Sequence, residues 1–178
     1  MRIGEALGLK WDDVDWTAGT LSLRRSLKKA KGRGQYLDDM KTRQSRRTVH
    51  LAPVAVTALR HHQDRQGFEK DKAENFYHDQ KLIFCSETGG FLHSANIHKY
   101  LHKHLKAAGL PRIRVHDLRH TAASLLLSQG VHAKLVQELL GHSTIALTMD
   151  TYSHVTPAMH QEVADTMQAL FGAGVGSS

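Results

Sequence analysis

The feature of the sequence that most limits its possible folds is a change in hydrophobic periodicity along the chain. Within residues 19–51, apolar residues alternate with polar ones, as at Leu21 and Leu23. A period of two is typical of strands with one buried face. From residue 94 onward, apolar residues recur three and four positions apart, which is typical of amphipathic helices. We therefore expect a mainly α fold with a small antiparallel β-sheet near the N-terminus, an α+β class.

Glycine and proline divide these patterns into elements. Residues 19–51 are expected to form two or three antiparallel strands, with a cationic hairpin around residues 41–47. Pro53 suits the first turn of a helix that continues to Gln63. The charged segment 67–80 has no periodicity and is expected to be a surface loop.

Helical spacing predicts five further helices. They cover residues 2–11, 94–108, about 117–129, a short piece from Leu135 to Leu140, and a last helix from Thr156 to Phe171. Ser94 is expected to cap the second of these. The third is expected to place four apolar residues inward: Leu118, Ala122, Leu125 and Leu126. Residues 1–171 are expected to form one domain, followed by a disordered tail over 172–178.

Composition excludes several classes of protein. The single cysteine, Cys85, excludes an internal disulfide and a cysteine-rich metal site. No apolar run approaches the roughly 18 residues of a membrane span, and no apolar signal core follows Met1. We therefore expect a cytoplasmic protein that has no membrane partner.

Positive charge is concentrated in one segment. The chain has 24 Lys and Arg against 17 Asp and Glu, and residues 24–47 hold ten of those bases and only two acids. Such a segment suggests a polyanionic partner, usually nucleic acid, although a solvated basic loop is the simpler alternative. The candidate DNA-binding residues are Arg24, Arg25, Lys28, Arg43, Arg46 and Arg47, together with Arg112 and Arg114.

Three short segments hold polar residues that packing does not require. His116 and Arg119 lie at an expected helix start, His142 lies in a turn between helices, and Tyr152 lies in a polar turn. With Arg2 and a hairpin lysine, this set suits phosphoryl transfer without a metal. Arginines can grip phosphate oxygens in pairs, a phenol can attack phosphorus, and a lysine can protonate the leaving hydroxyl.

The spacing of these residues resembles that of the tyrosine recombinases of the phage integrase type. His116 and Arg119 match a His-x-x-Arg motif, residues 140–142 match Leu-Gly-His, and Tyr152 follows ten residues after His142. The resemblance implies the fold of their catalytic domain.

Two N-terminal segments extend the resemblance. Residues 2–11 are similar to the first-arginine motif of the family, and Lys41, before residues 45–49, is similar to its hairpin lysine. Because neighbouring loops vary, Lys31 and Arg43 compete with Lys41 for that assignment. The resemblance continues in family order to about Val155.

The resemblance implies a role for each residue. Arg2 and Arg119 would clamp the scissile phosphate, His142 would donate a hydrogen bond to it, and Glu5 would orient an arginine or a histidine. The proton-transfer and nucleophilic roles fall to Lys41, which would protonate the 5′ oxygen, His116, which would assist the tyrosine, and Tyr152, which would form a 3′-phosphotyrosine. No cofactor and no metal is implied, because the covalent link conserves the phosphodiester energy.

The resemblance also implies partners and an origin. Double-stranded DNA would be the substrate, and four protomers would assemble on it through the last helix, docked in cis or in trans. The chain would come from a bacterium or a phage and act in the cytoplasm at the nucleoid. Family members normally have a separate DNA-binding domain before the catalytic one, whereas only Met1 precedes Arg2 here. We therefore expect an N-terminally truncated catalytic domain with an incomplete first helix and impaired activity alone.

Two other functions compete with the recombinase hypothesis. The chain could be a non-catalytic DNA-binding fragment with an idle site. It could also be a histidine-dependent metallohydrolase, since the sequence has 14 histidines. His116 and His120 have the spacing of metal ligands, but the intervening Arg119 disfavours a metal there. His98, His102 and His104 on one helix could form a metal patch, but they are more simply explained as solvated or phosphate-facing side chains.

Overall fold

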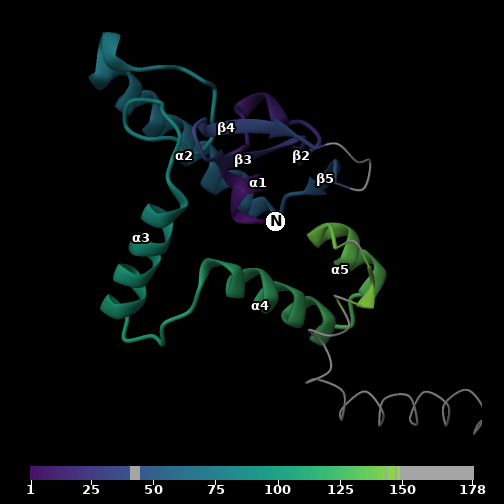
Figure 1. The fold of residues 1–178 in the computed structure, drawn as a ribbon. Coiled ribbons are helices and arrows are strands. Elements are labelled where there is room, and N and C mark those ends of the chain that lie inside the picture. The colour runs from purple at the N-terminus through teal and green to yellow at the C-terminus, as the bar shows by residue number, and fades with distance from the viewer. Residues whose placement is uncertain (41–44, 143, 147, 149–178) are drawn as a thin grey trace, which may run out of the picture.

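A computed structural model of the protein describes residues 1–40, 45–142, 144–146 and 148. Three helices, α3, α4 and α5, lie together in one half of the molecule, and the strands and helix α2 occupy the other (Figure 1). The short helix α1 lies between the two halves. The helix bounds are Ile3–Leu7 for α1, Pro53–Ala73 for α2, Ser94–Ala107 for α3, Val115–Ser128 for α4 and Ala133–Leu140 for α5. The expected α+β class is confirmed.

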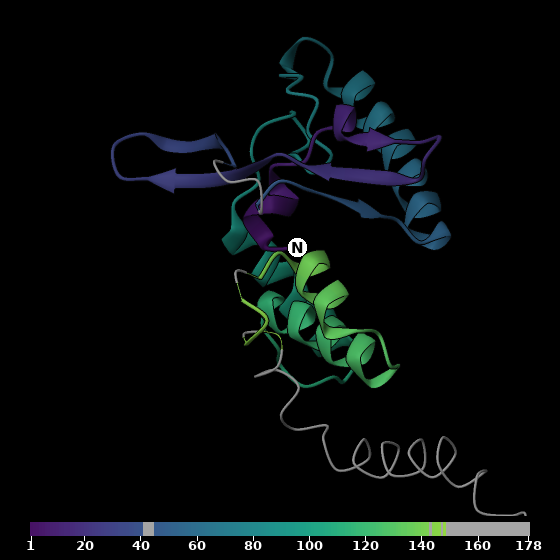
Figure 2. The same cartoon turned by 90° about the vertical axis from the view of Figure 1, so that its right-hand side faces the viewer.

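The strands form two antiparallel sheets where the sequence predicted one. The first sheet has the order β1-β2-β5, and the second is a hairpin of β3 and β4. Figure 2 shows that this hairpin extends away from the rest of the molecule. The strand bounds are Val14–Asp15, Thr20–Leu23, Arg25–Ala30, Gly34–Asp39 and Arg47–His50 for β1 to β5.

The sheet core confirms the alternating pattern of the sequence. Leu21 pairs with Val49 and Leu23 with Arg47 across β2 and β5. Leu21 and Leu23 are buried together with Leu9, Met40 and Ile83. Hydrophobic burial of this one face therefore fixes the register of the central strand.

Helix α2 is longer than predicted. It continues through Ala73 and is followed by a 3₁₀ turn at Glu74–Phe76, so residues 67–76 are not a loop. Gln66 anchors this half of the helix to the core, since its Nε2 donates to the carbonyl of Ile83 at 3.1 Å. Its Oε1 accepts from Trp11 Nε1 at 2.6 Å. The anchor is polar, and hydrophobic periodicity therefore did not reveal it.

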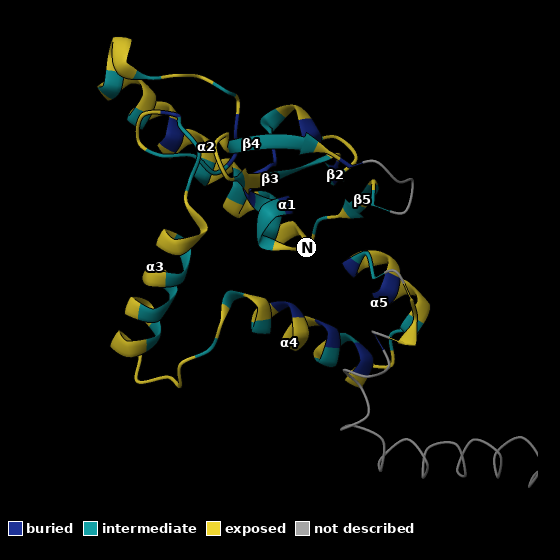
Figure 3. Cartoon of the chain, viewed as in Figure 1, coloured by how far each residue is buried: buried dark blue, intermediate teal, exposed yellow. Residues whose placement is uncertain are grey.

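Helix α4 buries a different face from the one predicted. Leu118 and Leu125 are 47% and 60% exposed, whereas Arg119, Ala123 and Leu127 are buried. These three residues are spaced four apart and share one face of the helix. Ala123 and Leu127 pack against α5 in a cluster of buried residues (Figure 3). The predicted inward stripe was therefore wrong for Leu118, Ala122 and Leu125, whereas Leu126 does pack against this cluster. The buried face contains an arginine.

Two helix boundaries also differ from expectation. Helix α1 ends at Leu7 and not at residue 11, because the chain then forms a bridge from Lys10 to Leu82. Helix α3 has His93 at its N-cap, and Ser94 is its first residue and does not cap it. None of the helices in the described ranges combines the length and hydrophobicity that a bilayer span requires.

Candidate active site

The site is built around the carboxyl end of helix α5. The helix ends at Gly141, which has left-handed backbone angles (φ 70°, ψ 46°). The amides of Gly141 and His142 both donate to the carbonyl of Gln137, at 2.8 and 3.1 Å. This reversal is favoured by glycine, and it fixes the direction in which the chain leaves the helix at His142.

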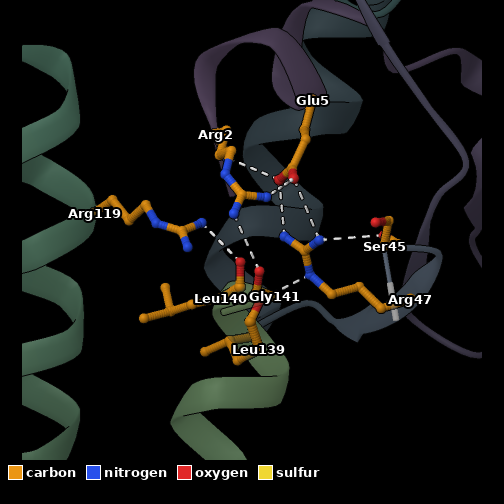
Figure 4. Close-up of polar contacts among 8 residues, drawn as sticks. All are labelled: Arg2, Glu5, Ser45, Arg47, Arg119, Leu139, Leu140 and Gly141. Carbon is orange, nitrogen blue, oxygen red and sulfur yellow. Dashed lines mark hydrogen bonds and ion pairs between the residues drawn. The ribbon is translucent and has the colours of Figure 1, made fainter. Parts of the chain in front are cut away.

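Three arginines from distant elements converge on the last carbonyls of α5. Arg47 Nε donates to Leu139 O at 3.0 Å, and Arg119 Nη1 donates to Leu140 O at 2.7 Å. Arg2 Nη2 donates to Gly141 O at 3.3 Å (Figure 4). These carbonyls have no partner within the helix, and the negative end of the helix dipole favours cations there.

Glu5 joins two of these arginines. Its Oε1 lies 3.0 Å from Arg2 Nη1 and its Oε2 lies 2.8 Å from Arg47 Nη2. It also accepts from the backbone amide of Arg2 at 2.8 Å, which closes the first turn of α1. Burial alone raises the pKa of Glu5, but hydrogen bonds from Arg47 and Arg2 outweigh it and hold the pKa below its usual value. The carboxylate therefore stays charged and orients both guanidinium groups.

Gly4 determines how closely α1 approaches strand β3. A Cβ at Gly4 would lie 2.7 Å from Ser26 Oγ and 2.9 Å from Leu27 O, so only glycine lets the helix approach strand β3 this closely. Helix α1 carries Glu5, and Arg2 is its N-cap residue. The close contact with β3 therefore places both side chains opposite the end of α5.

The two arginines of the predicted phosphate clamp differ in exposure. Arg119 is 7% exposed, and burial together with the positive charge of Arg2 lowers its pKa. The side chain of Arg2 is 53% exposed. Both residues, together with His116, line a cavity of about 550 Å³ between α1, α3 and α4. Most of the other residues that line it are apolar, among them Ile3, Ile97 and Leu118.

His142 is held from two sides. Its Nδ1 lies 2.9 Å from the hydroxyl of Thr148, which is fully buried, and its carbonyl accepts from Gln137 Nε2 at 3.2 Å. Burial and the charges of Arg119 and Arg2 lower the pKa of His142 to about 4. The ring is therefore neutral at neutral pH until an anion binds beside it.

His116 lies in the first turn of α4. Its ring meets that of His120 edge-on, with 4.6 Å between centroids. Partial desolvation and the neighbouring His120 and Arg119 lower the pKa of His116. A neutral imidazole is the form that can accept a proton. In the described part of the chain, no three His, Cys, Asp or Glu side chains gather into a metal-binding group.

Three predicted site residues, Lys41, Arg43 and Tyr152, lie outside the described residues. The structure therefore brings together Arg2, Glu5, Arg119 and His142, with His116 at the same cavity as the two arginines.

The predicted DNA-binding residues fall into two groups. Arg25 and Arg47 have side chains that are only 18% and 10% exposed, and each holds a buried carboxylate, Asp13 or Glu5. The other described members of that set are exposed: Arg24, Lys28, Arg46, Arg112 and Arg114. Some of these also make polar contacts. Lys28 Nζ pairs with Asp38, Arg114 pairs with Asp117, and Arg112 Nε donates to His102 Nε2.

Sequence reasoning missed the partners that hold the site. Thr148 and Gln137 position His142, and nothing in the sequence pattern identified them. For Arg47 a signal existed, because it lies two residues before Val49 on a strand that alternates between half-buried and exposed residues. By that alternation Arg47 faces inward with Val49.

Comparisons with known proteins agree on one family. A profile described as the phage integrase family matches residues 1–159. A tyrosine recombinase XerC-like protein from Caldanaerobacter subterraneus subsp. tengcongensis is 36% identical, over 96% of this chain and 46% of that protein. The tyrosine recombinase XerC of Halalkalibacterium halodurans is 31% identical, over 93% of this chain and 50% of its own length. The chain thus spans about half the length of these relatives.

Solved structures give the same fold. The Tn1549 transposon integrase in complex with transposon right end DNA superposes with a TM-score of 0.76 at 21% identity, over 97% of this chain and 55% of that one. The XerH site-specific recombinase bound to its difH substrate superposes with a TM-score of 0.64 at 28% identity, over 92% of this chain and 42% of that one.

Proposed function

Since the chain belongs to the phage integrase family of tyrosine recombinases, we propose that it is the catalytic domain of a site-specific DNA recombinase. The domain cleaves and rejoins DNA strands by transesterification through a 3′-phosphotyrosine at Tyr152. We assign residues 1–171 to this domain and 172–178 to a tail.

One observation carries the proposal: Arg2 and Arg119 are anchored on adjacent carbonyls, those of Gly141 and Leu140, directly before His142. These residues come from three separate parts of the chain. The guanidinium groups of Arg2 and Arg119 and the imidazole of His142 are groups that can bind a tetrahedral anion, and each can stabilise the negative charge that grows on phosphorus-bound oxygens.

The reaction requires one bond to form and one to break at phosphorus. The phenolic oxygen of Tyr152 attacks, and the bond from phosphorus to the 5′ oxygen breaks. The phenol proton passes to neutral His116, and Lys41 supplies a proton to the leaving 5′ oxygen. A 5′ hydroxyl from a partner strand then reverses the sequence and releases Tyr152, so the phosphoester bond count is unchanged.

Binding and assembly belong to the same proposal. Lys28 and Lys29 of the β3–β4 hairpin are exposed, and they would contact duplex phosphates, Lys28 in exchange for its pair with Asp38. The XerH and Tn1549 relatives were solved with DNA, which supports DNA as the substrate here. Protomers would associate through residues 156–171. The bacterial and phage origin of the relatives supports action at the bacterial nucleoid.

The test is a covalent trap on DNA of randomised sequence. A duplex library carrying 5′-bridging phosphorothiolates is incubated with the protein and separated under denaturing conditions. The leaving thiolate does not attack the phosphotyrosine, so covalent adducts accumulate even when cleavage is slow. We expect adducts that withstand a chelator and are lost in Tyr152→Phe.

The same experiment separates the competing functions. DNA retardation on a native gel without any denaturant-stable adduct would support a non-catalytic DNA-binding fragment. Strand cleavage that stops when a chelator is added would instead indicate metal-dependent hydrolysis.

A further inference from the structure

Arg47 occupies a position that a DNA-contacting side chain would not need. Its side chain is 10% exposed and lies between α1 and the end of α5. All three guanidinium nitrogens have partners within the protein: Nη2 lies 2.8 Å from Glu5 Oε2, Nε donates to Leu139 O at 3.0 Å, and Nη1 lies 3.5 Å from both Glu5 Oε1 and the Ser45 carbonyl. Its neighbour Arg46, by contrast, is exposed, although its Nε donates to the Met40 carbonyl at 2.8 Å.

A second observation shows how closely this guanidinium is seated. A Cβ built at Gly141 would lie 2.6 Å from Arg47 Nη1 and 2.9 Å from Arg47 Cζ. The guanidinium therefore covers the bare face of the glycine that turns the chain toward His142. Arg47 and Gly141 fit together only because the glycine has no side chain.

We propose that Arg47 is a positioning residue of the strand-transfer site. It fixes the positions of Arg2 and His142 relative to each other, through Glu5 and the end of α5. It acts on Arg2 through Glu5, whose other oxygen pairs with Arg2. It acts on His142 through Leu139 and Gly141, which fix the end of the helix from which His142 emerges. Arg47 does not contact the phosphate, and this role rests on the proposed function.

The physical consequence of removing Arg47 is a loosened junction between the two halves of the molecule. Glu5 would lose its pair with Arg47 and keep its pair with Arg2, and the Leu139 carbonyl would lose the bond from Arg47 Nε. Side-chain placement errors of about 1 Å can cost roughly 100-fold in rate. A phosphate ligand would behave differently, because its loss reduces the salt dependence of DNA binding.

The experiment compares Arg47→Ala with Arg46→Ala, its exposed neighbour, in the full chain. DNA affinity is measured across a range of salt concentrations, and adduct formation is measured as a single-turnover rate at saturating protein. For Arg47→Ala we expect an unchanged salt slope and a rate lower by about 100-fold. For Arg46→Ala we expect a slope shallower by about 0.9, the loss of one phosphate contact.

Two further measurements distinguish positioning from general loss of structure. In a double-mutant cycle, Glu5→Gln should slow Arg47→Ala by a smaller factor than it slows the unmodified protein, because the two residues share the Arg47–Glu5 contact. By NMR, Arg47→Ala should shift the ring resonances of His142, since Arg47 contacts the end of α5 from which His142 emerges. Urea unfolding shows whether each variant is folded under the assay conditions.

The outcomes are decisive in both directions. A shallower salt slope for Arg47→Ala, or a rate effect that multiplies with that of Glu5→Gln, would overturn the proposal. Failure of the proposed function is seen separately, because the unmodified protein would then form no adduct. In that case the salt slope and the ring resonances of His142 still decide whether Arg47 positions the site or contacts DNA.

Discussion

Arg119 donates from Nη1 to the carbonyl of Leu140 at 2.7 Å, so a buried cation on α4 is fixed to the end of α5. The bond places the guanidinium one residue away from the carbonyl that accepts from Arg2. The last carbonyls of a helix lack partners within it and favour positive charge. The end of α5 therefore serves as a common anchor for side chains that would grip one phosphate.

Replacing Gly141 tests this anchor. Gly141→Ala should lower the free energy of unfolding by about 1–2 kcal/mol from the left-handed backbone alone, with more from the contact that its Cβ would make with Arg47. Urea unfolding measures the loss. The control is Gly67→Ala, within α2, where a Cβ meets nothing within 4 Å. That change should stabilise the protein by about 0.5–1 kcal/mol, and destabilisation equal to that of Gly141→Ala would contradict this account.

Replacing Glu5 tests the link between the arginines. Glu5→Gln removes a buried negative charge from between Arg2 and Arg47, and breaking such a pair commonly costs about 3–5 kcal/mol. Chemical denaturation measures the change. Asp12→Asn is the matched control, because the Asp12–Lys81 pair is exposed on both sides and should contribute at most about 1 kcal/mol. Equal effects of the two substitutions would count against a structural role for Glu5.

Stability should depend on the protonation of His142. The pKa of this residue is about 4 in the folded protein and about 6.5 in an unfolded chain, so the unfolded state binds more protons between these values. Its contribution is therefore complete above about pH 6.5 and is lost as the pH falls toward 4. Urea midpoints measured across this window should fall more steeply for the unmodified protein than for His142→Gln. Parallel curves would show that the His142 pKa is not lowered by folding.

The two groups of basic residues should respond differently to substitution. Arg25→Ala leaves the carboxylate of Asp13, a buried residue, without its 2.6 Å partner, so we expect a loss of stability and little change in the salt slope of DNA binding. Lys28→Ala removes an exposed charge and should make that slope shallower by about 0.9. Fluorescence anisotropy at several salt concentrations measures both, and a shallower slope for Arg25→Ala alone would reverse the assignment.

The sequence predicted the fold class and the elements that hydrophobic periodicity defines, but it failed where polar groups determine packing. Residues 67–73 were assigned to a loop because they lack an apolar stripe, although Gln66 fastens that half of α2 to the core. The inward face of α4 was misassigned because its apolar majority includes Leu118 and Leu125, whereas the face that packs on α5 carries Arg119.

The candidate site shows the same limits. Motif spacing singled out Arg2, Arg119 and His142, and the structure brings the two arginines to the carbonyls just before that histidine. Their catalytic roles stay predictions. Charge alone predicts that Arg47 binds DNA. Neither composition nor spacing reveals that its guanidinium donates hydrogen bonds to Glu5 and to the Leu139 carbonyl. Such contacts join residues far apart in sequence, and only the folded chain defines them.

The most direct test of the central claim is to identify the residue that becomes linked to DNA. Adducts trapped on phosphorothiolate DNA are digested with nuclease and protease, and the linked peptide is sequenced by mass spectrometry. We predict a nucleotide joined through its 3′ phosphate to the oxygen of Tyr152. A link to any other side chain, or a trapped adduct that persists in Tyr152→Phe, would contradict the account.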